Sequence, residues 1–228
     1  MPGIVRQAYP MEEGLRDLTI GVLGGTGPLG KGLARRWSSA GLRVVVGSRS
    51  AQRADEAAAE IGGSASGAEN IECARAADVL VVAVPWDGHA DLLKSVAEAT
   101  AGKVVVDVVN PLGFDKRGPF RLDVPEGSAA EQAQALLPQA RVVGAFHHVS
   151  AVLLNDPEVA EIPMDVLVLG EERDDTDLVR SLADAVPGMR GVYGGRLRNA
   201  GQVEALTANL IAVNRRYRTH AGIRVTGV

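Results

Sequence analysis

The sequence reads Leu23-Gly24-Gly25-Thr26-Gly27-Pro28-Leu29-Gly30 where an apolar run meets a helical pattern. The apolar run, residues 18–23, is typical of a buried strand, and residues 29–40 have the pattern of a helix that Gly41 ends. Read from Gly25, the junction has the form G-x-G-x-x-G. Gly25 permits a tight turn, Gly27 lets the backbone approach a pyrophosphate, and Gly30 lets the helix pack closely on the strand.

This glycine-rich turn predicts a nucleotide site. The N-terminus of the following helix offers free N–H groups and the positive end of the helix dipole to an anion. We expect the phosphates to lie against Gly25, Thr26, Gly27, Pro28, Leu29 and Gly30. The alternative is a glycine turn with a purely structural role. The position of the motif, ahead of further alternating strands and helices, favours the nucleotide site.

The end of the second predicted strand, residues 43–47, indicates which dinucleotide binds. An NAD site usually has an acidic residue there, which accepts a hydrogen bond from the ribose 2′-hydroxyl. Here the chain continues as Gly47-Ser48-Arg49-Ser50, and Arg53 follows one helical turn later. A hydroxyl and two guanidinium groups suit a 2′-phosphate. The sequence therefore favours NADP held by Ser48, Arg49 and Arg53, over arginines that are simply solvated at a helix start.

The alternation of elements predicts an α/β fold, a Rossmann-like parallel sheet with helices on both faces. Further strands are expected at 79–84, 104–109 and 142–145, and helices at 51–61, 90–99 and 128–137. The rhythm changes near residue 148, which predicts an NADP-binding domain at 18–148 and a small α/β C-terminal domain at 149–228. Because the second part is small for independent stability, we expect it to pack on the first domain or on a second copy of the chain, and to provide the cleft and the dimer interface. In the second part, strands are expected at 166–170 and 191–193, and helices at 176–185 and 199–218. The last helix carries an apolar stripe that should face a core, made of Val203, Leu206, Leu210 and Val213.

Two proline-containing loops follow the fourth and fifth predicted strands. They are Val84-Pro85-Trp86 and Asn110-Pro111, and both are expected at the carboxyl edge of the sheet, where ligands bind in open α/β folds. We expect them to bracket the ribose and nicotinamide. Trp86 either covers a ring or anchors the next helix, and the residues favour neither reading.

His147 and His148 follow the sixth predicted strand at the same edge. Adjacent histidines suggest acid–base work or a metal site, but neighbouring side chains rarely reach one metal, and no nearby Cys, His or carboxylate cluster completes a ligand set. We expect them to shape the substrate pocket or to bond a carbonyl there. No motif for a nucleophile or for a proton donor to a carbonyl is present, so no catalytic residue and no metal are predicted.

Bulk properties narrow the classes of function. The net charge of −4 argues against a nucleic-acid surface, and no stretch approaches the roughly 20 apolar residues of a membrane span. The one cysteine, Cys73, excludes an internal disulfide framework and fits a reducing cytoplasm. Residues 1–17 lack the apolar segment of a signal peptide and are expected to form a flexible tail.

Taken together, the chain from about residue 18 onward resembles the NADPH-dependent reductases of the deazaflavin coenzyme F420. The resemblance rests on the glycine-rich turn, on Val46-Gly47-Ser48-Arg49, on Ala83-Val84-Pro85-Trp86 and on Ala145-Phe146-His147-His148. It continues in Gly127-Ser128-Ala129-Ala130-Glu131 and in the closing Ala221-Gly222-Ile223-Arg224.

This resemblance implies a cytoplasmic homodimer that passes a hydride directly between NADP(H) and F420. It implies that Thr26, Ser48, Arg49 and Arg53 hold the 2′-phosphate. It places Pro85 and Trp86 along NADP, and His147, His148, Val149 and Ser150 beside the deazaflavin, in a cleft between the two domains. The absence of a proton donor is then expected, because the coenzyme rings carry the chemistry.

Two other functions remain open at this point. One is an NADPH-dependent imine or hydroxyacid reductase; such enzymes usually carry a catalytic Lys or Asp in a longer C-terminal part, and the helix at 199–218 holds no lysine. The other is a non-catalytic NADPH sensor, which would bind NADPH without turnover of a deazaflavin.

Overall fold

The computed structural model describes residues 13–228, and the first twelve lie outside the described part. Most of the predicted flexible tail therefore lies there as well. Its last five residues form a short 3-10 helix, η1 (Glu13–Asp17), in which Leu15 is buried. The prediction of a flexible tail is wrong for these five residues, because Leu15 packs into the hydrophobic core on one face of the sheet, together with Leu33 and Trp37.

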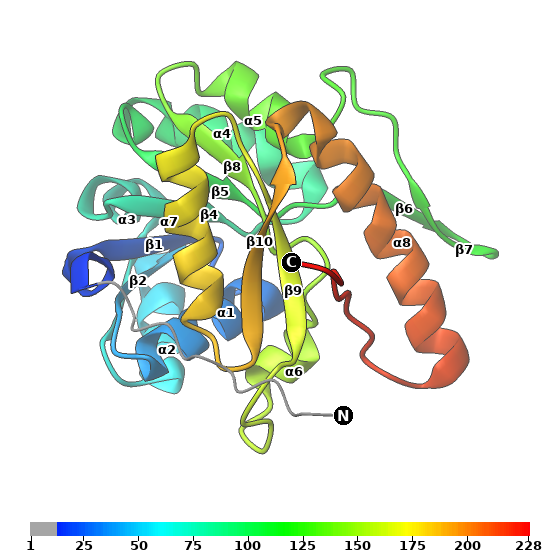
Figure 1. Ribbon diagram of the computed structural model, residues 1–228. Coiled ribbons are helices and arrows are strands. Elements are labelled where there is room, and N and C mark those ends of the chain that lie inside the picture. Colours follow the sequence, from blue (N-terminus) through cyan, green and yellow to red (C-terminus); the bar gives the residue numbers. More distant parts are fainter. Residues whose placement is uncertain (1–12) are drawn as a thin grey trace.

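One eight-stranded sheet forms the centre of the molecule (Figure 1). Its order is β10-β9-β8-β5-β4-β1-β2-β3. The strands are β1 (Thr19–Leu23), β2 (Arg43–Ser48), β3 (Ala65–Glu69), β4 (Val79–Val82), β5 (Val104–Asp107), β8 (Arg141–Gly144), β9 (Met164–Leu169) and β10 (Met189–Gly195). Most contain a run of two to four consecutive valine or leucine residues, as expected for strands that helices cover on both faces.

Six of these strands run parallel, in the order β3-β2-β1-β4-β5-β8 of a Rossmann fold. The direction reverses at β9, which pairs antiparallel with β8 through Gly144 and Leu169, and β10 is parallel to β9. The predicted parallel sheet is confirmed for the first six strands. The predicted small C-terminal part contributes no sheet of its own, since β9 and β10 extend the first one. A functional division at residue 148 stays a prediction.

Helices cover both faces of the sheet. One face carries α1 (Pro28–Ser39), α2 (Ala51–Ile61), α6 (Ala151–Asn155) and α7 (Arg173–Asp184). The other carries α3 (Asn70–Ala76), η2 (Trp86–Gly88), α4 (His89–Val96), η3 (Ala97–Thr100), α5 (Ala129–Leu136) and η4 (Leu197–Asn199). Ser50 and Ser128 cap α2 and α5, and Gly41 adopts a positive φ of 83° after α1, as its role as a helix stop predicts.

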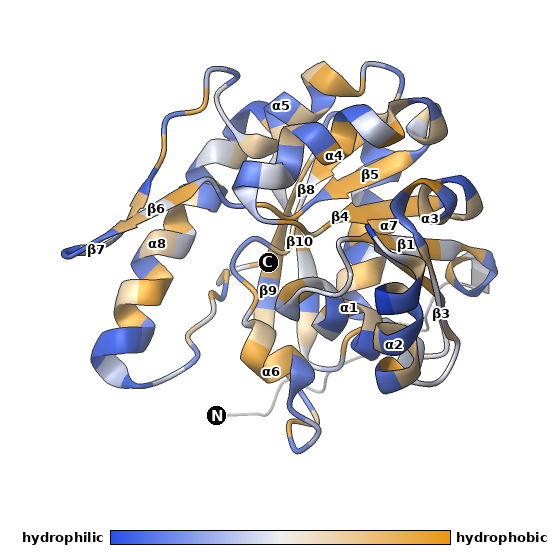
Figure 2. Ribbon diagram, turned by 180° about the vertical axis from the view of Figure 1, so that it is seen from behind, coloured by the Kyte–Doolittle hydropathy of each residue, from blue (hydrophilic) through white to orange (hydrophobic). Residues whose placement is uncertain are grey.

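The last helix, α8 (Ala200–Tyr217), stands off from the sheet beside a hairpin made of β6 (Leu112–Asp115) and β7 (Gly118–Arg121) (Figure 1). Of the predicted apolar stripe, only Val203 is buried; Leu206 and Leu210 are half-buried and Val213 is exposed. The prediction that the whole stripe faces a core is therefore wrong beyond the first turn. Figure 2 shows apolar residues along the rest of α8, interleaved with polar ones. Within residues 13–228, no helix has the length and apolarity needed to cross a membrane.

After α8 the chain returns to the sheet and lies against β9 (Figure 1). Asp165 of β9 is fully buried and accepts two hydrogen bonds from the Arg190 guanidinium, at 2.7 and 3.0 Å, and one from the Val225 backbone at 2.7 Å. The Asp165 N–H donates to the carbonyl of Ile223, and Arg190 donates to that of Val228. Burial opposes ionisation of Asp165, but the bonds from Arg190 and Val225 outweigh it and lower its pKa.

We expect Asp165→Asn to lower the free energy of unfolding at pH 7 by about 1–3 kcal/mol, because an amide nitrogen then faces donors that have lost their acceptor. Because the Asp165 pKa is lowered in the folded protein, its ionised carboxylate contributes fully to stability above its unfolded-state pKa of about 4. This contribution is lost as the pH falls through the folded-state pKa. Urea unfolding at several pH values measures the difference in free energy of unfolding between the wild type and Asp165→Asn. This difference should become smaller as the pH falls. Asp91→Asn, at an exposed position on α4, is the matched control; equal stability of the two variants at pH 7 would contradict the prediction.

Candidate cofactor site

The turn between β1 and α1 has the close approach that the glycine motif predicts. The Gly25 N–H donates to the carbonyls of Val22 and Gly47, and an added Cβ at Gly25 would lie 2.8 Å from the Val22 oxygen. A Cβ on Gly30 would lie 2.9 Å from the Gly25 Cα. At Gly27 the nearest atom of the chain would be 3.4 Å away, so packing within the chain does not itself demand glycine there. That difference fits the expectation that Gly27 makes room for a ligand.

The N-terminus of α1 suits an anion. Its N-cap is Gly27, which has no side chain to cap the helix, and its first turn contains Pro28 and no acidic residue. The N–H groups of Leu29 and Gly30 therefore belong to the unsatisfied first turn. On the other side of the turn, Asn70 of α3 accepts a hydrogen bond from the Gly24 N–H at 3.4 Å. The geometry fits a pyrophosphate at the predicted position.

The structure places Ser48, Arg49 and Arg53 at the carboxyl end of β2, beside this turn. Ser48 is buried, whereas Arg49 and Arg53 are exposed. Neither guanidinium has a hydrogen bond or an ion pair within residues 13–228. No carboxylate of the described residues pairs with these two guanidinium groups. Both are therefore available to bind a phosphate group of a ligand.

The loop after β4 meets the glycine-rich turn. Val84 lies against it, since a Cβ on Gly24 would be 2.4 Å from the Val84 Cγ1. Pro85 is exposed and Trp86 is half-buried. The Trp86 ring stacks on the ring of His89 in α4, with centroids 5.4 Å apart and an interplanar angle of 29°. Trp86 therefore anchors the following helix, which was one of its two predicted roles.

The loops after β5 and β8 are joined through one carbonyl. The Asn110 side-chain amide donates to the His147 carbonyl at 2.7 Å, and the Thr207 hydroxyl of α8 donates to it at 3.0 Å. Pro111 is buried next to Asn110. Predicted NADP-contacting and predicted substrate-contacting residues are thus brought together at the carboxyl edge of the sheet.

His147 and His148 are both buried, and none of their ring nitrogens has a hydrogen-bond partner in the described residues. Burial lowers the pKa of each to about 4, so both rings are neutral at pH 7. The Asn110 Oδ1 is also buried without a partner. Phe146, just before them, has a φ of 60°, a conformation that non-glycine residues rarely adopt. A strained turn beside several unsatisfied polar atoms is typical of a ligand site.

Val149 and Ser150 continue this segment into α6. Val149 is buried, and the Ser150 hydroxyl oxygen accepts from the Leu153 N–H at 3.4 Å as the N-cap of α6. The Ser150 oxygen also lies 3.4 Å from His220 Nδ1. The serine therefore has a structural partner already, and its predicted contact with a deazaflavin stays a prediction.

Hydrogen bonds from a single arginine of α1 hold α6 and the residues that follow it against α1. Arg36 of α1 donates to the carbonyls of Leu153, Leu154, Asp156 and Val159 at distances of 2.7 to 3.1 Å. Asn155 donates to the Pro28 carbonyl at 2.8 Å, directly on the glycine-rich turn. Burial lowers the Arg36 pKa, although the residue stays charged at neutral pH. The cluster holds α6 next to the predicted phosphate site.

The sequence analysis missed a buried polar cluster beneath these loops. It contains His89 of α4, Asp107 at the end of β5 and Glu204 of α8. The signals were present: a carboxylate at the carboxyl end of a buried strand, and an acidic residue beside Val203 on the apolar stripe of the last helix. Among residues 13–228, no group of three or more His, Cys, Asp or Glu side chains is arranged to hold a metal ion.

Comparison with known proteins agrees with this geometry. A family profile described as "NADP oxidoreductase coenzyme F420-dependent" matches residues 19–111. The F420-dependent NADP reductase of Methanothermobacter thermautotrophicus is 38% identical over 92% of this chain and 96% of its own length. The protein of the same name from Methanothermobacter marburgensis is 38% identical over 92% of this chain and 99% of its own.

A solved structure is similar along the same length. The "putative f420 dependent nadp-reductase" from Arthrobacter sp. FB24 superimposes with a TM-score of 0.79 at 25% identity, covering 92% of this chain and 99% of that one. At more than 30% identity along nearly their whole length, the two methanogen reductases show the family. This chain belongs to the F420-dependent NADP reductase family.

Proposed function

We propose that this protein catalyses hydride transfer between NADP(H) and coenzyme F420. The observation that supports the proposal most is the match to F420-dependent NADP reductases along almost the whole chain. The family profile, which matches residues 19–111, spans the glycine-rich turn and the second strand end, where the geometry fits NADP. No observation favours an imine or hydroxyacid reductase or a sensor over this activity.

In this proposal, the N-terminus of α1 binds the pyrophosphate through Gly25–Gly30, and Ser48, Arg49 and Arg53 bind the 2′-phosphate. Val84, Pro85 and Trp86 line the nucleotide on one side, and Asn110 and Pro111 on the other. The unpaired ring nitrogens of His147 and His148 then meet the polar edge of the deazaflavin, next to Val149 and Ser150. A polar ligand edge would satisfy atoms that are otherwise buried at a cost.

No protein group needs to give or take the hydride. The nicotinamide and the deazaflavin supply the redox chemistry when they are bound. The residues of the chain bind the two coenzymes, hold them face to face and exclude water. Because His147 and His148 are neutral at pH 7, they suit hydrogen bonding to the coenzyme better than proton delivery. We also propose that the protein acts in the cytoplasm, as its one cysteine predicts.

We expect Arg49→Ala to weaken NADPH binding about 10- to 150-fold and to leave NADH binding nearly unchanged. One lost charge-assisted contact to the 2′-phosphate accounts for about 1.5–3 kcal/mol. Arg43→Ala is the matched control, because Arg43 is equally exposed but lies at the opposite end of β2. Titration of both variants with both nucleotides measures the effect. Equal losses for NADPH and NADH would show that Arg49 does not bind the 2′-phosphate.

NADPH that carries deuterium on the transferred face should deliver the label to F420 in ordinary water, and EDTA should leave the rate unchanged. The reason is that direct transfer involves neither a protein intermediate nor a metal. Mass spectrometry of the reduced deazaflavin reads out the label, and the free reduced coenzyme provides the control for exchange. Label that is found in solvent under non-exchanging conditions would require a relay through a protein group.

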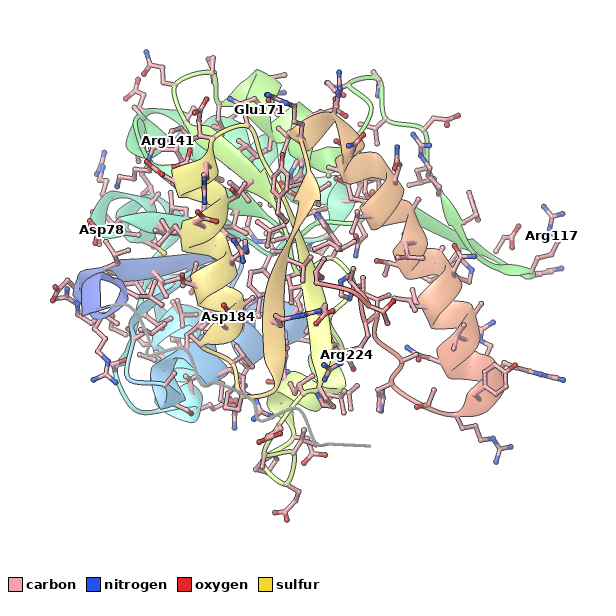
Figure 3. The ribbon with its side chains drawn as sticks, viewed as in Figure 1. Asp78, Arg117, Arg141, Glu171, Asp184 and Arg224 are labelled. Carbon is pink, nitrogen blue, oxygen red and sulfur yellow. The ribbon has the colours of Figure 1, made fainter. Side chains whose placement is uncertain are left out.

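We also propose that α8 and the β6–β7 hairpin bind a second copy of the chain. Leu206 and Leu210 of α8 are only half-buried and Val213 is exposed, while Phe114 and Tyr217 are 67% and 73% exposed. The hairpin projects from the body, with Arg117 at its tip (Figure 3). Burial of such surface in a homodimer is favourable in proportion to its apolar area.

Light scattering at low micromolar concentration should give twice the 23.8 kDa of the chain. Val213→Glu should shift the mass towards the monomer, because it places a charge on the exposed stripe of α8. Val152→Glu, at an exposed apolar position on α6, should leave the mass unchanged. A monomeric wild-type protein at that concentration would remove the proposal.

A further inference from the structure

A histidine and an aspartate are in hydrogen-bond contact in the interior, next to the proposed cofactor loops. His89 of α4 and Asp107 of β5 both have no exposed side-chain surface, and the His89 Nε2 lies 2.6 Å from the Asp107 Oδ2. The proposed reaction does not use either residue. Burying two ionisable side chains costs free energy unless further hydrogen bonds satisfy them. The groups that bond to His89 and Asp107 therefore indicate the role of the pair.

The partners of the His89 ring indicate its charge. Its Nδ1 lies 3.0 Å from the Gln132 Oε1, while its Nε2 faces the Asp107 carboxylate. The Gln132 amide nitrogen donates to Glu126 at 3.3 Å, which orients the Gln132 oxygen towards the histidine. Both ring nitrogens therefore face acceptors, and only a doubly protonated imidazolium can donate to both. Burial lowers the His89 pKa, but the hydrogen bond and charge of Asp107 outweigh it and raise the pKa overall.

Two titratable groups from other elements lie near the pair: Glu204 of α8, whose charge acts on His89, and His147 after β8, on which the charge of Asp107 acts. Glu126, before α5, is linked to the pair through Gln132. The Glu204 carboxylate accepts from the Ala129 and Ala130 N–H groups at the start of α5. Burial, together with the charge of Asp107, raises the Glu204 pKa to about 7. Above pH 7, where Glu204 is ionised, its negative charge adds to that of Asp107 and favours the protonated form of His89.

The pair is bonded to both loops that flank the proposed NADP site. On one side, the Trp86 ring stacks on the His89 ring. On the other, the second Asp107 oxygen accepts from the Val109 N–H at 3.0 Å, next to Asn110, which donates to the His147 carbonyl. A chain of contacts thus runs from the loop after β4, through His89 and Asp107, to the loops after β5 and β8.

We propose that His89 is a permanently charged imidazolium and that, paired with Asp107, it is the positioning residue for the loops at Trp86 and Asn110. The pair acts through these loops and touches no coenzyme itself. Its role in the reaction rests on the proposed function, but the protonation state of His89 does not.

The protonation state is measured first, without any coenzyme. The chain has only four histidines, so the ring nitrogens of protein labelled with ¹⁵N-histidine are few enough to assign with a His89→Gln variant. Both nitrogens of His89 should appear protonated at pH 8, while His147 and His148 appear neutral. A neutral His89 at pH 7, with its proton on Asp107 or absent, would overturn the proposal.

Asp107→Asn separates charge from hydrogen bonding. The Asn oxygen can still accept from Val109, and its amide can donate to the Nε2 of a neutral His89, whose Nδ1–H keeps its bond to Gln132. We expect the ¹⁵N spectrum of this variant to change to the neutral form of His89. A His89 that stays doubly protonated without the carboxylate would show that Asp107 does not hold the charge. Should this variant not fold, the wild-type spectrum still decides the charge of His89.

The positioning role is measured as the single-turnover rate of hydride transfer, well below the melting temperature of each variant. His89→Ala should slow transfer about 10- to 100-fold, as expected when reacting groups are displaced by about 1 Å. Asp107→Asn should slow it less, because its hydrogen bonds remain. The control is Asp175→Asn, which breaks an ion pair with Arg141 at the amino end of β8 and should leave the rate unchanged (Arg141 is labelled in Figure 3).

The outcomes are distinguishable. If His89→Ala transfers hydride as fast as the Asp175→Asn control, the pair has only a structural role and the positioning proposal fails. Asp107→Asn that is as slow as His89→Ala would show that the charge itself, rather than positioning, is what matters. A wild-type protein that binds NADPH but transfers no hydride to F420 would contradict the proposed function while leaving the ¹⁵N result intact.

Discussion

Helix α1 packs so closely against the turn after β1 that a Cβ atom on Gly30 would lie 2.9 Å from the Gly25 Cα. This approach brings the first N–H groups of α1 to the carboxyl edge of the sheet. The same helix then organises the rest of that face. Trp37 donates from its indole nitrogen to the Leu182 carbonyl of α7 at 2.8 Å, and Arg36 binds four carbonyl oxygens around α6. The position of α1 therefore determines both where a phosphate can bind and where the neighbouring segments lie.

The features that were predictable from the sequence are those in which local pattern and tertiary structure agree. The valine-rich strands, the glycine turn and the end of α1 at Gly41 are all specified within a few residues. Ser48, Arg49 and Arg53 could be grouped for the same reason, because they are separated by only one turn of chain. Strand β3 was not predicted, since its sequence, Ala65-Ser66-Gly67-Ala68-Glu69, carries little β propensity. It forms as an edge strand because β2 offers it a complete parallel ladder.

The parts that could not be predicted depend on contacts between distant residues. Glu204 on α8 caps α5, and no local pattern connects positions 75 residues apart. The direction of β9 is a similar case. The sequence of an apolar strand does not show whether it pairs parallel or antiparallel with its neighbour. The antiparallel pairing of β9 with β8 is therefore visible only in the structure. The assignment of His147 and His148 to the substrate pocket stays a prediction, and the strain at Phe146 and the lack of partners for their rings among residues 13–228 required coordinates.

The attachment of α6 to Arg36 has a consequence for the dynamics of the molecule. A helix of five residues is far below the length at which an isolated helix is stable, so α6 owes its order to the arginine and to Asn155 rather than to its own hydrogen bonds. Its local unfolding therefore requires those bonds to α1 to break. We expect α6 and α1 to exchange their amide hydrogens as one cooperative unit, because α6 is bonded to Pro28 in the first turn of α1 and to Arg36 in its last turn. A ligand that protects the start of α1 should therefore slow exchange across α6 as well.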